Sequence, residues 1–177
     1  MRALRFLGVD PGLAVVGWAR GGTILHAAGT YTPPAAARGV QRLIAIRDAV
    51  LREAADCDLV VIEGPSFASR GRAIVSLGEL HGVLRVGLHE AGIRYVDLAP
   101  AAVKTIATGR GNASKEEVLV AAVKRLDYSG AIPDVADALW MLEAARQQYG
   151  CSPIELPKTH VRALRSVKWP EINPNGR

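Results

Sequence analysis

Residues 4–12 read LRFLGVDPG, and this stretch decides how the chain folds. An apolar run that stops at an acid followed by Pro-Gly is typical of a buried strand that delivers one charged side chain to the rim of a sheet. Here that side chain is Asp10. Because a carboxylate is costly to bury without a partner, we expect positive charge beside it.

Three further acids stand in comparable places. Glu63 ends the run LVVIE at 59–63 and is followed by Gly-Pro, while Asp134 and Asp137 form an Asp-x-x-Asp pair just after Pro133. Residues at i and i+3 lie on one face of a helix. Carboxylate oxygens are hard ligands that suit Mg²⁺ or Mn²⁺ better than zinc. The four acids therefore predict a divalent-cation site.

The pattern around these acids predicts an α/β domain that opens with an antiparallel meander. Glycines supply the turns between the first strands. A Ser-x-x-Glu capping box at Ser114 and Glu117 predicts a helix start at Lys115, and Pro133 suits the first turn of a last helix. We expect strands at 4–9, 14–20, 23–32, 58–63 and 94–98, and helices at 36–55, 72–91, 100–107, 115–126 and 133–149.

The helix over 72–91 carries two apolar faces. Its main face, which we expect to pack on the sheet, holds Ile74, Leu77, Leu80, Leu84 and Leu88. Val75, Val83 and Val86 form a second face, which is a candidate subunit contact.

Length and composition indicate one soluble domain rather than two. The chain has 177 residues, of which 49% are hydrophobic and 22% charged. No apolar run approaches the ~20 residues needed to span a bilayer, and the N-terminus lacks a signal-peptide layout. We therefore expect a cytoplasmic protein with no membrane association. Cys57 and Cys151 lack metal-ligand spacing, and we interpret both as reduced thiols.

The net charge of +5 favours a polyanionic partner. Two segments carry much of the positive charge. Residues 98–115 hold Lys104, Arg110 and Lys115 without an acid, and residues 151–177 hold +3. Four prolines interrupt the second segment, so we expect a nuclease-like domain over 1–150 followed by a partly flexible basic tail over 151–177.

Taken in order, these motifs resemble the RuvC family of Holliday junction resolvases, within the RNase H-like nuclease superfamily. The resemblance covers about residues 4–149. The segment 64–67 departs from the family pattern, and the tail after Tyr149 has no counterpart. The matching segments are GVDPG at 8–12, VIE at 61–63, VK at 103–104, SK at 114–115 and PDVADAL at 133–139.

The resemblance implies a mixed five-stranded sheet with three antiparallel strands first, flanked by helices. It also implies that Asp10, Glu63, Asp134 and Asp137 hold two Mg²⁺ ions, with Mn²⁺ able to substitute, for hydrolysis of a phosphodiester. Lys104 and Lys115 match basic positions close to the cut phosphate in this family, so we include both among the catalytic residues.

Branched DNA is the substrate that the resemblance implies, with four-way junctions cut by a homodimer. The loop over 64–72 follows Glu63 directly and contains Phe67, Arg70 and Arg72. Phe67 is the candidate to stack on or wedge between bases at the branch point. Arg70, Arg72 and Arg110, together with the two lysines, are candidate DNA contacts.

Three alternatives compete with this interpretation. The same chemistry could act on flaps, forks, other branched DNA or RNA–DNA hybrids. The chain could be a DNA-binding module without catalysis, which the presence of all four acids disfavours. An actin-like ATPase would need a second domain and a second Gly-rich phosphate loop, and this sequence has neither.

Overall fold

The computed structural model describes residues 2–65 and 72–172. Within them, five strands form one mixed sheet in the order β3-β2-β1-β4-β5. The first three strands are antiparallel, and β4 and β5 run parallel to β1. This is the predicted RNase H-like arrangement. The strands are β1 Phe6–Asp10, β2 Val16–Gly21, β3 Leu25–Tyr31, β4 Leu59–Glu63 and β5 Tyr95–Leu98.

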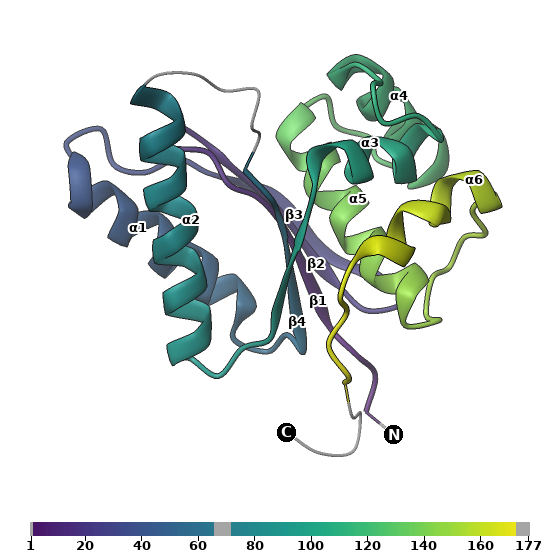
Figure 1. Cartoon of the computed structure of the whole chain (residues 1–177), viewed down its shortest axis with the longest axis horizontal. Helices are drawn as coiled ribbons and strands as arrows, with labels where there is room; N and C mark the ends of the chain where they lie inside the picture. The colour runs from purple at the N-terminus through teal and green to yellow at the C-terminus, as the bar shows by residue number, and fades with distance from the viewer. Residues whose placement is uncertain (1, 66–71, 173–177) are drawn as a thin grey trace.

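Helices cover both faces of this sheet, as Figure 1 shows. One face carries α1 Gly39–Ala54 and α2 Arg72–Glu90. The other carries α3 Pro100–Thr108, α4 Lys115–Arg125 and α5 Pro133–Gln148. Because both faces are covered, the central strands are apolar at nearly every position, and residues 59–62 of β4 are fully buried. The predicted elements are confirmed, with ends that differ by a few residues.

Strand alternation divides the core into two clusters. Leu7, Val9, Val60 and Ile62 face α1 and α2, where they meet the fully buried Leu84 and other leucines of α2. Phe6, Leu59 and Val61 face α5 instead. The next residues of the same parity are Asp10 on β1 and Glu63 on β4, so both acids point to the α5 side.

The second apolar face predicted for α2 is only partly exposed. Val75 and Val86 are 62% and 56% exposed. Val83 is less exposed than these two valines, because it packs partly against the core of its own chain. On the neighbouring helix α1, Val40 and Ile44 are also exposed. Among the described residues, the α1–α2 layer thus presents these four large apolar side chains at its surface.

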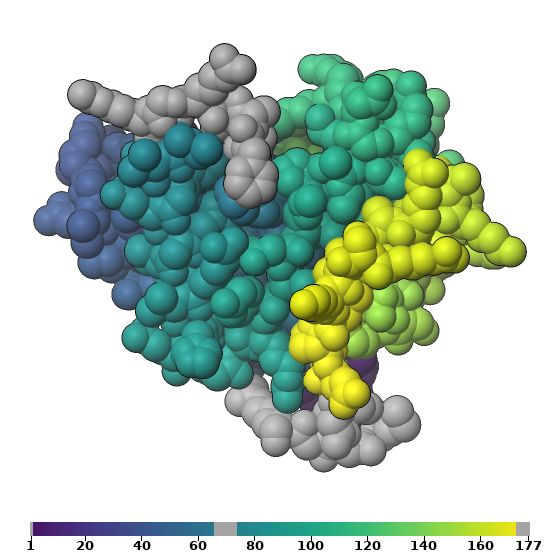
Figure 2. All heavy atoms as spheres, in the orientation of Figure 1, coloured from purple at the N-terminus to yellow at the C-terminus, as the bar shows by residue number. Residues whose placement is uncertain are grey.

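The segment after α5 is packed on the domain, which corrects the predicted flexibility for residues 151–172. It contains α6 Lys158–Val161 and the 3₁₀ helix η1 Arg162–Ser166. Leu156 and Leu164 are buried in the α5-side core. In Figure 2 the yellow segment lies across the surface of the neighbouring elements. Prolines do interrupt longer elements here, but apolar residues between them still bury.

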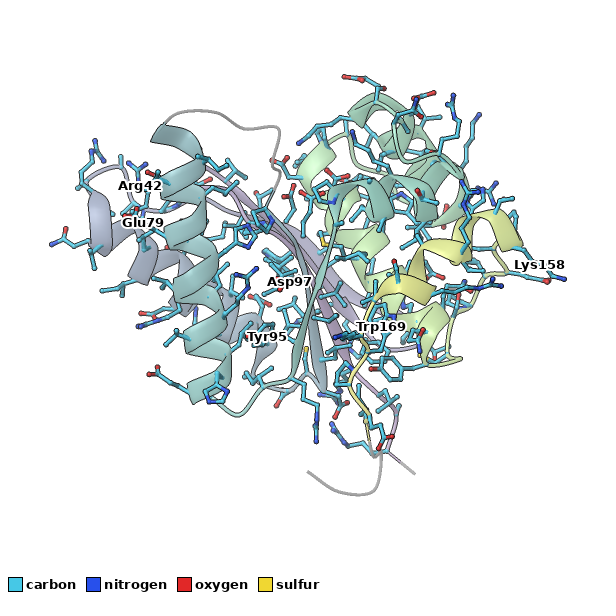
Figure 3. The ribbon with its side chains drawn as sticks, viewed as in Figure 1. Arg42, Glu79, Tyr95, Asp97, Lys158 and Trp169 are labelled. Atoms are coloured by element: carbon cyan, nitrogen blue, oxygen red, sulfur yellow. The ribbon has the colours of Figure 1, made fainter. Side chains whose placement is uncertain are left out.

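Aromatic packing ties the far end of this segment to the sheet. Tyr149 stacks on Phe6 of β1, and its ring meets Trp169 edge-on at a centroid distance of 6.0 Å. In Figure 3 Trp169 lies at the base of α5, whereas Lys158 lies at the outer edge of α6. Cys57 and Cys151 are free thiols, as predicted. In the described ranges none of the helices is long and apolar enough to cross a membrane.

Candidate active site

Two carboxylates come from adjacent parallel strands at the same rim of the sheet. Val9 of β1 is in register with Ile62 of β4, so Asp10 and Glu63 each follow one residue later on neighbouring strands. Each of the two carboxyl groups affects the pKa of the other. The register of the two strands therefore holds the two acids side by side at this end of the sheet.

Two glycines allow α5 to bring the other two carboxylates to this rim. A Cβ at Gly17, which pairs with Asp10 across β1 and β2, would clash with the backbone carbonyl of Asp134. A Cβ at Gly8 would clash with the carbonyl of Ala138 and lie 2.7 Å from the backbone nitrogen of Leu142. Only glycine permits so close an approach of helix to strand.

Lys115 supplies the positive charge that the buried acids require. Its Nζ lies 3.3 Å from Asp134 Oδ1 and 3.9 Å from Asp137 Oδ2. The predicted capping box fixes where this lysine emerges, because Ser114 Oγ accepts from the Glu117 amide and the Glu117 carboxylate accepts from the Ser114 amide. Lys115 is thus the first residue of α4 and faces the first turn of α5.

Burial and mutual repulsion raise the pKa of three of the acids. Burial, and then the charge of Asp137, raise the pKa of Asp10 to about 7. Burial and the neighbouring Asp10 raise the pKa of Glu63 to about 8. Burial raises the pKa of Asp137 to about 6 although Lys115 opposes the rise. Carboxylates so crowded require more positive charge than one lysine provides.

Lys115 itself responds to the same cluster. Burial alone would lower its pKa, but the charges of Asp10, Asp137 and Asp134 together raise it above the ordinary value. The ammonium is therefore held in its charged form by the acids. A site that stabilises one cation in this way is electrostatically prepared for another.

The donor set fits a hard divalent cation, although the side chains do not converge on one point. Across residues 2–65 and 72–172, no three His, Cys, Asp or Glu side chains form a group that could hold a metal ion as arranged. Two of the carboxylates, those of Asp134 and Asp137, instead pair with Lys115. Four carboxylates, three of them with raised pKa values, nevertheless match the oxygen chemistry that Mg²⁺ and Mn²⁺ take.

The remaining predicted residues lie at different distances from this cluster. Lys104 of α3 is half-buried and near enough to Asp137 to lower its pKa. Arg110 is exposed in the loop between α3 and α4, where it pairs with Glu117. Phe67 and Arg70 lie outside the described residues. Arg72 begins α2, but its side chain also lies outside them.

Sequence reasoning missed the roles of Gly8 and Gly17. A signal was present, because a glycine inside a strand often marks a close approach of another backbone. Gly8 was interpreted only as part of a motif, and Gly17 not at all. The partner at each glycine is a helix more than 100 residues later, which no local pattern identifies.

Comparisons with known proteins identify the family of this chain. Residues 6–142 match the family model described as "Crossover junction endodeoxyribonuclease RuvC". The protein of that name from Ruegeria pomeroyi is 31% identical over 168 residues, covering 90% of this chain and 100% of the relative. The one from Sorangium cellulosum is 34% identical over 145 residues, covering 77% and 80%.

A solved structure shows the same fold. The structure of T. thermophilus RuvC in complex with Holliday junction substrate aligns with a TM-score of 0.68 at 20% identity, over 84% of this chain and 97% of that one. Given the match over most of its length, the chain belongs to the family of the crossover junction endodeoxyribonuclease RuvC and is a nuclease.

Proposed function

We propose that this chain cuts both strands of four-way DNA junctions by metal-dependent hydrolysis at the Asp10, Glu63, Asp134 and Asp137 cluster. The single observation that carries the proposal is the meeting of these acids from β1, β4 and α5 around Lys115. The names of the family and its curated relatives, crossover junction endodeoxyribonucleases, support the substrate.

We assign the four acids as the ligands of two Mg²⁺ ions, with Mn²⁺ as a substitute. Ions so bound supply an activated water and stabilise the leaving oxygen. Asp10, whose pKa responds to Glu63 and to the acids of α5, would contribute to holding these ions. Because these pKa values are raised, binding of a cation near neutral pH would be coupled to the release of protons from the cluster.

Basic side chains near the acids would stabilise charge on the phosphate and contact the DNA. Lys115, already beside Asp134 and Asp137, is placed to offset negative charge on the phosphate as the bond breaks. Lys104 and Arg110 extend the positive surface from α3 to the following loop. We keep Phe67, Arg70 and Arg72 as proposed DNA contacts, on the basis of their position next to Glu63 in the sequence.

A panel of DNA substrates tests the proposal. A synthetic mobile four-way junction should be nicked in opposite strands with Mg²⁺ and left intact with EDTA, whereas linear duplex should resist both. If flaps, forks or RNA–DNA hybrids are cut as fast as the four-way junction, the enzyme has a broader substrate range than the one proposed. Tight junction binding without cutting under any divalent cation would indicate a binding module and refute the enzyme assignment.

Paired cutting requires two active sites, and we propose that two copies meet through the α1–α2 layer. The exposed Val75 and Val86 of α2, with Val40 and Ile44 of α1, are the apolar side chains available there. A charge at Val86 would lose its water when two copies meet, but would remain solvated in the monomer.

Sedimentation provides the test of this contact. The wild-type chain should sediment as a dimer at micromolar concentration and Val86→Glu as a monomer. Val123→Glu on α4, at a similarly exposed valine on the other layer, is the matched control and should remain dimeric. A monomeric wild type, or dissociation by both variants alike, would remove this contact from the account.

A further inference from the structure

The end of α3 contains a carbonyl that the helix itself does not satisfy. The last four carbonyls of any helix lack an intrahelical partner. In α3 the Gly109 amide donates to Thr105, and the Thr108 hydroxyl donates to the Lys104 carbonyl. The Ile106 carbonyl lies 2.7 Å from Nδ1 of His160, a residue of α6. Because a carbonyl only accepts, Nδ1 must carry the proton and donate.

A second contact from the same segment holds the turn that follows α3. Gly109 adopts a left-handed conformation with φ +80°, and its carbonyl accepts from Arg162 Nη2 at 3.3 Å. The imidazole of His160 lies directly over this turn, because a Cβ at Gly109 would stand 3.2 Å from its Nε2. Residues 160 and 162 thus cap α3 from a part of the chain about 50 residues later.

This cap is fixed to the body of the domain rather than hanging free. Leu156 and Leu164 flank it in sequence and are buried in the α5-side core. Before it, the side chain of the fully buried Glu143 of α5 accepts hydrogen bonds from Gln147 and Ser152. The segment therefore links α5, which carries two of the acids, to the end of α3.

The capped elements carry the basic residues that lie beside the acids. Lys104 is on α3, one turn before the capped end, and Arg110 follows Gly109 directly. The Arg110 amide donates to the Thr108 hydroxyl at 3.2 Å, so the loop continues from the helix without a break in its hydrogen bonds. Fraying of the α3 end would move both basic side chains relative to the acids.

We infer that His160 and Arg162 are positioning residues, which hold the end of α3 and the Gly109–Ala113 loop so that Lys104 and Arg110 meet the phosphates of the bound junction. This inference rests on the proposed DNA contacts of those two residues. Both positioning residues lie beyond residue 142, where the match to the family model ends.

Substitutions at His160 separate the hydrogen bond from packing. His160→Leu keeps an apolar side chain but leaves the Ile106 carbonyl without its donor, while His160→Asn keeps a donor close to the place of Nδ1. Loss of a buried donor shifts the local equilibrium toward fraying by about tenfold. We expect junction binding, measured by anisotropy with Ca²⁺, to weaken about 5- to 10-fold in His160→Leu and to recover in His160→Asn.

Further readouts distinguish positioning from general stability. In His160→Leu, amide hydrogen exchange should quicken at 107–113, which are the end of α3 and the loop that follows it. In a Lys104→Ala/Arg110→Ala background, His160→Leu should add little loss of binding, since its effect passes through those residues. Binding by His160→Leu equal to that of wild type would overturn the inference, whatever its melting temperature.

Arg162 gives an independent pair of neutral variants. Arg162→Gln retains a donor for the Gly109 carbonyl and Arg162→Met does not, so only the methionine variant should quicken exchange at 107–113. Identical exchange in the two would overturn the role of Arg162. A wild-type chain that neither binds nor cuts junctions would refute the proposed function, whereas quickened exchange with unchanged binding would refute the positioning inference alone.

Discussion

The two faces of the sheet are covered in different ways, and the difference separates stability from chemistry. On the α1–α2 face, large aliphatic side chains such as Leu84 and Ile62 fill the space between the layers. On the α5 face, Gly8 and Gly17 leave no side chain between strand and helix at the rim. The first arrangement packs apolar side chains of the helices against apolar side chains of the strands. The second brings together carboxylates that repel one another.

Close approach on the α5 face has an electrostatic cost that the α1–α2 face does not bear. Acids with raised pKa values destabilise the fold whenever they are ionised without a cation. Apolar burial on both faces of the sheet offsets that cost. A protein that keeps such a cluster at the rim does so for function, because packing alone would favour apolar residues there.

The largest expected effect on the α5 face comes from removing single acids. Asp134→Asn and Glu63→Gln should each lower the cleavage rate by at least ~10³-fold, since each deletes an assigned metal ligand worth several kcal/mol. Junction binding should persist or tighten, because negative charge is lost near the phosphates. Rate measurements under single turnover decide this, and near-normal nicking by both variants would exclude the carboxylate site.

A glycine substitution sharpens the contrast between the faces. Gly17→Ala should displace the first turn of α5 and reduce cleavage by ~10²-fold, as displacements near 1 Å do, at a stability cost of ~1–3 kcal/mol. Leu84→Ala on the opposite face should cost more stability, ~2–5 kcal/mol, yet keep most activity below its melting temperature. If the loss of cleavage activity is proportional to the loss of stability in both variants, the proposed difference between the two faces is wrong.

A smaller effect follows from the raised pKa values of Asp10, Glu63 and Asp137, about 7, 8 and 6 in the fold against ~4 in an unfolded chain. The folded state then binds more protons from about pH 4 to pH 8, so stability falls as pH rises through that window. Thermal melts in EDTA should show this fall, reduced in Asp10→Asn.

Divalent cations should reverse the same trend. Added Mg²⁺ should raise the melting temperature more near pH 8 than near pH 5, because protons compete for the ligands at low pH. Two outcomes would contradict the electrostatic crowding of the acids. One is a wild-type melting temperature that does not fall over this pH range in EDTA, and the other is the same pH dependence of the melting temperature in Asp10→Asn and in the wild type.

The fold could be predicted because its signals are local. Apolar runs that end on Asp10 and Glu63, the capping box at Ser114 and Pro133 before α5 each mark an element boundary within a few residues. The four acids could be predicted as a group, since strand ends and a helix face restrict where their side chains point.

Features made by long-range contacts could not be predicted in this way. The approach of α5 to Gly17 and the hydrogen bond from His160 to Ile106 join residues far apart in sequence. Proline content predicted a flexible tail, but Leu156, Leu164 and Trp169 find partners that only the folded domain creates. In residues 151–172, the burial of a few apolar side chains orders the segment although its prolines prevent long helices or strands.

Direct measurement of Mn²⁺ binding tests the central claim that the α5 face holds a metal site. Calorimetric or paramagnetic-resonance titration of the free protein near pH 8 should detect two ions per chain in the wild type, and Asp10→Asn should remove at least one of them. Leu84→Ala, measured below its melting temperature, should bind as the wild type does. An absence of binding in the wild type, or equal binding by the wild type and Asp10→Asn, would contradict the account.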